Sequence, residues 1–61
     1  MNKTILIIED ELKIRFLLRD YLKSEGFNVL EASDGDEGIF VFKNNKIDLI
    51  LLDIMMPKID G

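Results

Sequence analysis

The sequence predicts an α/β fold in which strands and helices alternate to build a parallel sheet. Short apolar runs alternate with longer amphipathic segments, the runs at residues 4–10, 27–32 and 47–53 and the segments at residues 11–26 and 33–46. An alternation of this kind produces parallel strands joined by right-handed crossovers. The expected order is therefore β-α-β-α-β, within one small domain of 61 residues.

The apolar runs differ in how deeply they are expected to be buried. The first (TILIIED) and the third (IDLILLD) are apolar on both faces and end in acid, which is typical of strands inside a parallel sheet. The second (FNVLEA) is short and partly polar, which favours an edge position. The sequence therefore predicts two buried strands and one edge strand.

Both amphipathic segments are predicted to be helices. In the first, apolar residues recur at helical spacing, Gly26 marks the C-terminal end, and cations occupy most of the other face: Lys13, Arg15, Arg19 and Lys23. In the second, Asp34 and Glu37 match a capping box. Gly38 costs about 1 kcal/mol relative to alanine, so this helix is expected to be the weaker one. We expect the phenylalanines of both segments to be packing residues: Phe16, Phe40 and Phe42.

Composition excludes several classes of function. The chain has no cysteine and no histidine, so disulfides, thiolate chemistry, zinc sites of the Cys/His kind and imidazole base catalysis are excluded. Its 12 acidic residues outnumber 8 basic ones, for a net charge of -4, which argues against direct nucleic-acid binding. No apolar run resembles a signal peptide or approaches the length of a membrane span. We therefore expect a soluble, cytoplasmic protein with no membrane partner.

Acidic side chains follow the two buried strands. Glu9, Asp10 and Glu11 come after the first strand, and Asp53 ends the third. Ligands of parallel α/β sheets collect at the carboxyl ends of the strands, so these carboxylates converge if the first and third strands are neighbours. Carboxylates held close together raise one another's pKa unless a cation lies among them. Hard oxygen ligands completed by water describe a Mg²⁺ site.

A plainer interpretation stays open for each acid. Glu9, Asp10 and Glu11 could only complement the dipole of the helix that they precede. Asp53 could merely end a strand and begin a turn. The combination favours the metal site, because two buried strands deliver acid at the same end of the sheet.

Several motifs resemble a known family. The stretches ILIIEDE, LKSEGFNVLEASDGDEG, IDLILLD and LLDIMMPKIDG are similar, in order and spacing, to the receiver domain of bacterial two-component response regulators, especially those attached to winged-helix DNA-binding domains. The resemblance covers residues 1–61 and implies a flavodoxin-like, doubly wound parallel sheet with strand order 2-1-3-4-5. Because the chain ends after the third strand, we expect the N-terminal half of such a domain, a truncated receiver fold.

The resemblance also implies a role for each site residue. Asp53 is expected to be the phospho-acceptor, whose carboxylate attacks the phosphohistidine of a sensor histidine kinase and forms an acyl phosphate. Asp10 and Asp53 are expected to bind Mg²⁺ directly. Glu9 is expected to reach the metal mainly through water, and Met55 to bind it through the backbone carbonyl. The metal neutralises the clustered charges, so that an anionic nucleophile can approach an anionic donor.

Departures from the family pattern limit what the chain is expected to do by itself. The family's Ser or Thr on the fourth strand, its Lys on the fifth strand, the dimerisation surface and the output domain are missing from the 61 residues. We therefore expect a phosphoprotein module that is not an enzyme and does not signal in isolation. An exposed third strand without proline, bulge or inward charge predicts a homodimer or higher self-association through that strand.

Other functional classes fit the residues less well. The main alternative is a self-associating structural fragment without phosphotransfer activity. Aspartyl-nucleophile phosphatases need a second acid two residues after the nucleophile, where this chain has Met55. A flavodoxin needs a Ser/Thr/Gly-rich phosphate loop after the first strand, where this chain has EDELK.

Overall fold

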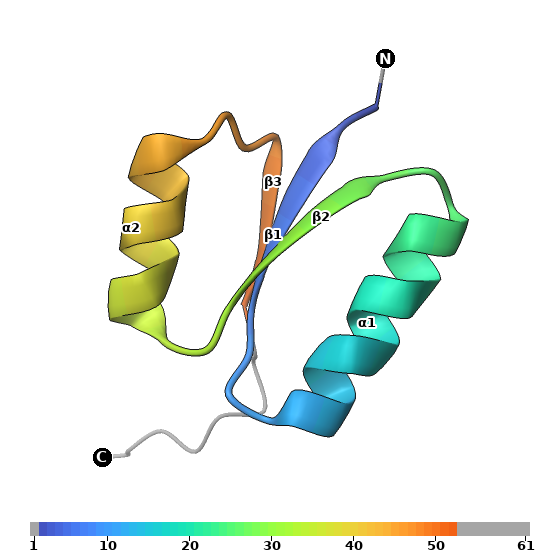
Figure 1. Ribbon diagram of the computed structural model, residues 1–61, viewed down its shortest axis with the longest axis horizontal. Coiled ribbons are helices and arrows are strands. Elements are labelled where there is room, and N and C mark those ends of the chain that lie inside the picture. The colour runs from blue at the N-terminus through green and yellow to red at the C-terminus, as the bar shows by residue number, and fades with distance from the viewer. Residues whose placement is uncertain (1, 53–61) are drawn as a thin grey trace.

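The computed structural model describes residues 2–52 and confirms the predicted α/β order. Strands and helices alternate along the chain (Figure 1): β1 is Thr4–Ile8, α1 is Leu12–Ser24, β2 is Asn28–Ala32, α2 is Gly35–Asn44 and β3 is Leu49–Leu52. The first four elements are each shorter than the segments that predict them. The acidic residues at the end of the first apolar run lie beyond β1, at the start of the turn that leads into α1.

β1 is the middle strand of a parallel sheet with the order β2-β1-β3. Its last residue, Ile8, pairs with Ala32 of β2 and with Leu52 of β3. The order confirms that the first and third strands are neighbours and that the second lies at an edge. The burial predicted for the third strand is wrong for the described residues, because β3 pairs only with β1 there and Leu49, Ile50 and Leu52 are exposed. Because all the strands run in the same direction, their carboxyl ends meet at one end of the sheet.

The two helices cover opposite faces of the sheet (Figure 1). On one face, Leu22 of α1 packs with Ile5 and Ile7 in a core that half-buried neighbours extend: Leu18, Phe27, Val29 and Leu51. On the other face, α2 lies against β1 at Ile8. Side chains alternate between the two faces along a strand, so β1 supplies both cores and has to be apolar throughout. Leu6 and Ile7 are accordingly 0% and 1% exposed.

The end of α1 is a Schellman motif, which directs the chain back toward the sheet. Gly26 has a φ of 96°, a left-handed conformation that costs L-residues about 1–2 kcal/mol. The N–H of Gly26 donates to the Lys23 carbonyl (3.0 Å), and the N–H of Phe27 donates to the Leu22 carbonyl (3.1 Å). Since Leu22 and Phe27 also belong to the same core, the turn and the packing stabilise one another. The predicted helix end at Gly26 is confirmed.

Gly38 is the point at which α2 closely approaches β1. The residue is buried, and a Cβ added to it would lie 2.5 Å from Ile8 Cδ1 and 3.1 Å from Ile8 Cγ1. Glycine inside a helix is less favourable than alanine by about 1 kcal/mol. The short distance to Ile8 explains why α2 tolerates this cost, because a Cβ at this position would displace the Ile8 side chain.

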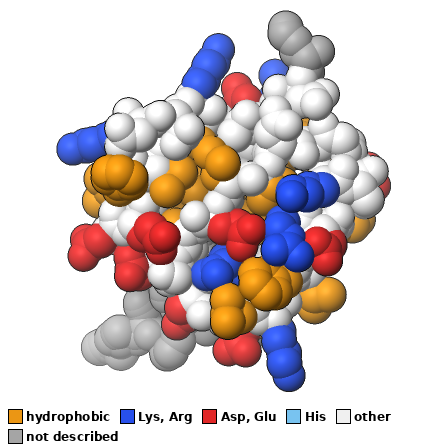
Figure 2. All heavy atoms as spheres, in the orientation of Figure 1, with side chains coloured by type: hydrophobic (Ala, Val, Ile, Leu, Met, Phe, Trp, Pro, Cys, Tyr) orange, Lys and Arg blue, Asp and Glu red, His pale blue; other side chains and the backbone are white. Residues whose placement is uncertain are grey.

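The packing role predicted for three phenylalanines is wrong for the described part of the chain. Phe16, Phe40 and Phe42 are 40%, 66% and 50% exposed. Figure 2 shows hydrophobic side chains at the surface over both helices, interspersed with charged ones. The prediction fails because these side chains lie on parts of the helices that the described residues leave uncovered. Phe16 instead contacts Arg19, whose Cζ lies 4.5 Å from the ring centroid.

Replacing Gly38 with alanine is expected to lower the free energy of unfolding by about 1 kcal/mol. Overpacking a close contact costs about 1–3 kcal/mol, which outweighs the gain in helix propensity of about 1 kcal/mol. The matched background is Ile8→Val, which removes the Cδ1 atom that the new Cβ meets. In that background Gly38→Ala is expected to raise the free energy of unfolding. Urea denaturation of the four proteins measures both effects, and a stabilised Gly38→Ala single variant would contradict the packing argument.

Candidate functional site

The carboxyl end of β1 carries the first acidic residues of the predicted site. Glu9 directly follows the strand and is 3% exposed, and its N–H donates to the Ala32 carbonyl of β2 (3.0 Å). Asp10, the next residue, is exposed. The turn therefore holds one carboxylate inside the protein and presents the next one to solvent.

The carboxylate of Glu9 is bound within the turn itself. Its Oε2 accepts a hydrogen bond from the N–H of Glu11 (2.9 Å). Glu11 is the N-cap residue of α1 but makes no capping hydrogen bond with its side chain, and the first turn of α1 contains no acid. Among these three acids, the geometry thus shows a local bond that shapes the turn and no direct capping of the helix.

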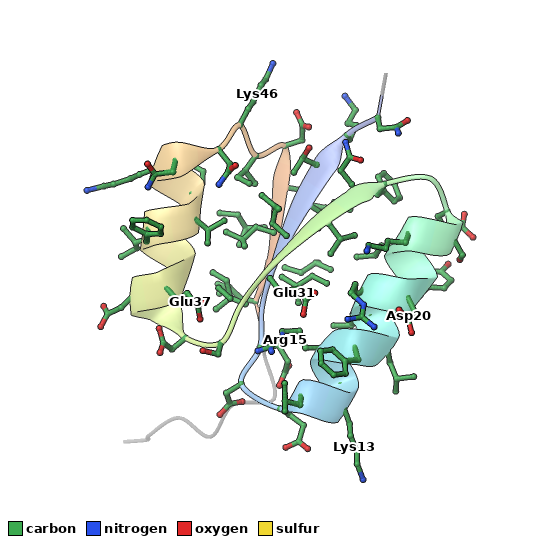
Figure 3. All side chains as sticks on the ribbon, viewed as in Figure 1. Lys13, Arg15, Asp20, Glu31, Glu37 and Lys46 are labelled. Atoms are coloured by element: carbon green, nitrogen blue, oxygen red, sulfur yellow. The ribbon has the colours of Figure 1, made fainter. Side chains whose placement is uncertain are left out.

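Arg15 of α1 reaches the same turn from the side. Its Nη1 donates to the Glu9 carbonyl (3.0 Å), and its Nε donates to Oε1 of Glu31 on β2 (3.0 Å). In Figure 3 the side chains of Arg15 and Glu31 point toward one another between α1 and β2. Arg19 lies farther from the same carboxylate, with Nη1 3.8 Å from Glu31 Oε2.

The contacts of Arg15 with the acidic turn and with Glu31 were not predicted from the sequence, which places Arg15 on the cationic outer face of the first helix. Its side chain is only 13% exposed. A signal was present in β2: Glu31 pairs with Ile7, whose side chain lies in the core beneath α1. A carboxylate on that apolar face requires a cation from the covering helix, because burying an unpaired charge is costly.

Two of the predicted site residues, Asp53 and Met55, lie outside the described residues. The structure brings β3 beside β1 as far as Leu52, the residue before Asp53 in the sequence. Within residues 2–52, no group of three or more acidic, histidine or cysteine side chains is arranged to hold a metal ion. The metal-binding roles of Glu9, Asp10, Asp53 and Met55 therefore stay predictions.

The turn between β2 and α2 lies at the same end of the sheet and contains the predicted cap. Asp34 Oδ1 accepts from the N–H of Glu37 (2.8 Å), as a capping box requires. In a capping box the glutamate side chain accepts a bond from the N–H of the N-cap residue. Here Glu37 Oε1 instead accepts from the N–H and the hydroxyl of Ser33 (both 2.8 Å), one residue before the N-cap. The pKa of Glu37 is lowered below its ordinary value of 4.5. The hydrogen bond from the backbone N–H of Ser33 has the largest effect and that from the Ser33 hydroxyl the next largest, because both bonds favour the ionised form.

At the opposite end of the sheet, a cavity of about 310 Å³ is lined by five residues: Asn2, Lys3, Thr4, Lys46 and Asp48. Thr4 and Asp48 are joined there, since the N–H of Thr4 donates to Asp48 Oδ2 (2.8 Å) and the N–H of Asp48 donates to the Thr4 carbonyl (2.8 Å). Thr4 begins β1, so this cavity and the acidic turn are at opposite ends of the same strand.

The acidic turn, the parallel register and the strand order are those expected of the family that the motifs resemble. The sequence from residue 5 to residue 61 matches the family model described as the response regulator receiver domain. The chain belongs to this family. The resemblance drawn from the motifs is thereby confirmed, and the αβ elements described above are the receiver fold of two-component response regulators as far as Leu52.

Curated relatives of this receiver chain are transcriptional regulators by name. The alkaline phosphatase synthesis transcriptional regulatory protein PhoP of Bacillus subtilis (strain 168) is 48% identical over 61 residues, which cover 100% of the chain and 25% of the relative. The transcriptional regulatory protein CpxR of Escherichia coli (strain K12) is 46% identical over 61 residues, with the same shares. The probable transcriptional regulator ycf27 of Porphyridium aerugineum is 46% identical over 60 residues, 98% of the chain and 25% of the relative.

The receiver chain spans about a quarter of the length of these relatives. No solved structure matches it. Neither helix of the described part of the chain is long and apolar enough to cross a membrane.

The pH dependence of α2 is expected to follow the carboxyl of Glu37. Its pKa is lowered in the folded chain, so its contribution to stability is complete above the unfolded-state pKa and is lost as the pH falls through the folded-state pKa. NMR titration of the Glu37 carboxyl carbon is expected to give a pKa below 4.5. In Ser33→Ala the pKa is expected to rise partway, because the backbone donor remains. A Glu37 that titrates at its ordinary value would contradict the capping geometry.

Proposed function

We propose that this chain is the phospho-acceptor module of a two-component signal transduction system, with Asp53 as the acceptor. The observation that carries the proposal is the order β2-β1-β3. It brings the end of β1, with Glu9 and Asp10, beside Leu52, the residue that precedes Asp53. This order supports the proposal that Asp53, which follows β3 in the sequence, forms one site with the acids after β1.

The chemistry is transfer of a phosphoryl group to a carboxylate. An oxygen of Asp53 attacks the phosphorus of the phosphohistidine of a sensor histidine kinase. The new O–P bond forms as the N–P bond breaks, and the departing imidazole takes up a proton. The product is an acyl phosphate on Asp53. Since the nucleophile and the donor are both anionic, the positions of nearby charges decide whether they can approach.

The donor atoms at the carboxyl end of β1 fit Mg²⁺. Glu9 and Asp10 provide hard carboxylate oxygens, the ligands that this ion prefers. We assign the site to Glu9, Asp10, Asp53 and the backbone carbonyl of Met55, with Glu9 acting mainly through water. When bound, Mg²⁺ supplies charge neutralisation for the transferred phosphoryl group.

The names of the longer relatives extend the proposal to the process that the receiver regulates and to the partner of the receiver. PhoP and CpxR are named as transcriptional regulatory proteins, so the phosphorylated receiver is proposed to regulate transcription through a winged-helix output domain of a full-length parent. The partner of the receiver, within the full-length parent, is proposed to be a sensor histidine kinase. The chain is not an enzyme in this proposal, and with a net charge of -4 it does not bind nucleic acid or membrane directly.

Phosphorylation of Asp53 is tested by intact-mass spectrometry. The chain is incubated with acetyl phosphate, with and without Mg²⁺, and the expected result is a Mg²⁺-dependent adduct of one phosphoryl group. Asp53→Asn is expected to abolish the adduct, because the amide is not a nucleophile. The matched control is Asp36→Asn, which removes an exposed acid from the first turn of α2 and is expected to leave the adduct unchanged.

Absence of the adduct in the wild-type chain, with Mg²⁺ present, would favour the alternative of a structural fragment without phosphotransfer activity. One observation supports this second candidate. Leu49, Ile50 and Leu52 of β3 are 53%, 40% and 64% exposed, and β3 pairs only with β1 among residues 2–52. The strand itself, LILL, has no charge to repel another strand, so a second copy of the chain is proposed to pair with it.

Self-association is tested by sedimentation velocity at micromolar concentration. The wild-type chain is expected to sediment as a dimer or larger species. Ile50→Lys is expected to yield monomers, since a lysine on an edge strand blocks pairing. Ile39→Lys serves as the control, because Ile39 is equally apolar and 56% exposed but belongs to α2. A folded wild-type monomer would exclude pairing through β3.

A further inference from the structure

We infer that Arg15 is a positioning residue that sets the turn of Glu9 and Asp10 for cation binding. The inference rests on the proposed function, because it concerns the same Mg²⁺ site. Arg15 itself is not a ligand: its guanidinium donates to the Glu9 carbonyl and to Glu31. The role assigned to it is to fix the backbone from which the two acidic side chains project.

The backbone of Glu9 is held on both sides. Its N–H donates to the Ala32 carbonyl (3.0 Å), which ties the residue to β2, and its carbonyl accepts from Arg15 Nη1 (3.0 Å). The atoms from Cα of Glu9 to Cα of Asp10 lie in one peptide plane. The bond from Arg15 therefore fixes the orientation of the plane that leads to Asp10, the residue proposed to bind the cation directly.

Arg15 can hold this plane because it is itself fixed at two points. Its backbone N–H donates to the Glu11 carbonyl (2.9 Å) in the first turn of α1. Its Nε donates to Glu31 Oε1 (3.0 Å), so the guanidinium bridges β2 and the acidic turn. A guanidinium offers several donors in a rigid planar fork, whereas a lysine ammonium is a single charge on a flexible stem. Lysine at this position can keep the ion pair but cannot reproduce both bonds with one fixed geometry.

Arg19 provides a natural comparison on the same helix. It lies beside the same carboxylate, with Nη1 3.8 Å from Glu31 Oε2, and its other described ion pair is with Asp20. None of its described hydrogen bonds is with Glu9. If the cluster of Arg15, Arg19 and Glu31 only fastens α1 to β2, then Arg15→Lys and Arg19→Lys should behave alike.

The experiment measures Mg²⁺ binding to the chain by isothermal titration calorimetry for the wild type, Arg15→Lys and Arg19→Lys. Loss of an outer group that orients metal ligands weakens binding by about tenfold or more, and this loss is expected for Arg15→Lys alone. Amide hydrogen exchange at Glu11, whose N–H donates to Glu9 Oε2, provides a readout that needs no metal. Exchange there is expected to be faster in Arg15→Lys and unchanged in Arg19→Lys.

Each outcome decides a different question. A wild-type chain that binds Mg²⁺, with equal affinities in both lysine variants and unchanged exchange at Glu11, would overturn the role of Arg15 and leave the proposed function intact. A wild-type chain that binds no Mg²⁺ would overturn the cation site, and the positioning role would fall with it. Weaker Mg²⁺ binding in both variants, in proportion to their loss of stability, would also overturn the positioning role. In that case Arg15, Arg19 and Glu31 only attach α1 to β2.

Discussion

The burial of β1 between two parallel neighbours is the constraint on which the rest of the structure depends. Leu6 and Ile7 are 0% and 1% exposed, and full burial of such side chains contributes about 1.5–3 kcal/mol each. Because the strand is covered on both faces, its register with β2 and β3 cannot slip by one residue without turning each side chain to the wrong helix. The parallel direction then brings the ends of all the strands, and the residues that follow them, to one end of the sheet.

This arrangement leaves a carboxylate in an unfavourable position unless it is bound. Glu9 follows β1 directly and is 3% exposed, so its charge is largely removed from water. The turn supplies the N–H of Glu11 to the carboxylate, and Arg15 binds the adjoining carbonyl. Glu31 in turn restrains Arg15, which makes the acidic turn part of a network that joins β1, α1 and β2. Local hydrogen bonds and ionic contacts thus meet at the carboxyl end of β1.

The two helices are attached to the sheet in different ways. α1 is followed by Gly26 in a left-handed conformation. The next residue, Phe27, packs against the core beneath α1 and leads into β2. α2 lies close to β1 at Gly38, because a residue without a side chain leaves room for Ile8. Gly26 is needed for its backbone conformation, which lets the chain turn, whereas Gly38 is needed for its size, which permits close contact. The flanks of the helices keep large apolar side chains at the surface in the described part of the chain.

The sequence by itself determined the order of elements, the edge position of the second strand, the end of α1 and the Asp34 cap of α2. These features follow from local patterns: apolar runs, helical spacing, and glycine or capping residues at fixed offsets. The family also follows from short motifs, because the acids and the turn after the third strand occur together in one order. The Mg²⁺ ligands and the acceptor role of Asp53 were read from the same motifs and remain predictions.

Only the tertiary structure decided how Arg15 and Glu31 are used, why Gly38 occurs within a helix, and which apolar residues stay exposed. Arg15 and Glu31 are 16 residues apart, and their contact depends on how α1 crosses β2. The role of Gly38 likewise depends on its distance from Ile8, which no local pattern specifies. Exposure of the phenylalanines depends on how much sheet lies beneath each helix. Such relations arise when separate segments pack together, so a pattern within one segment does not contain them.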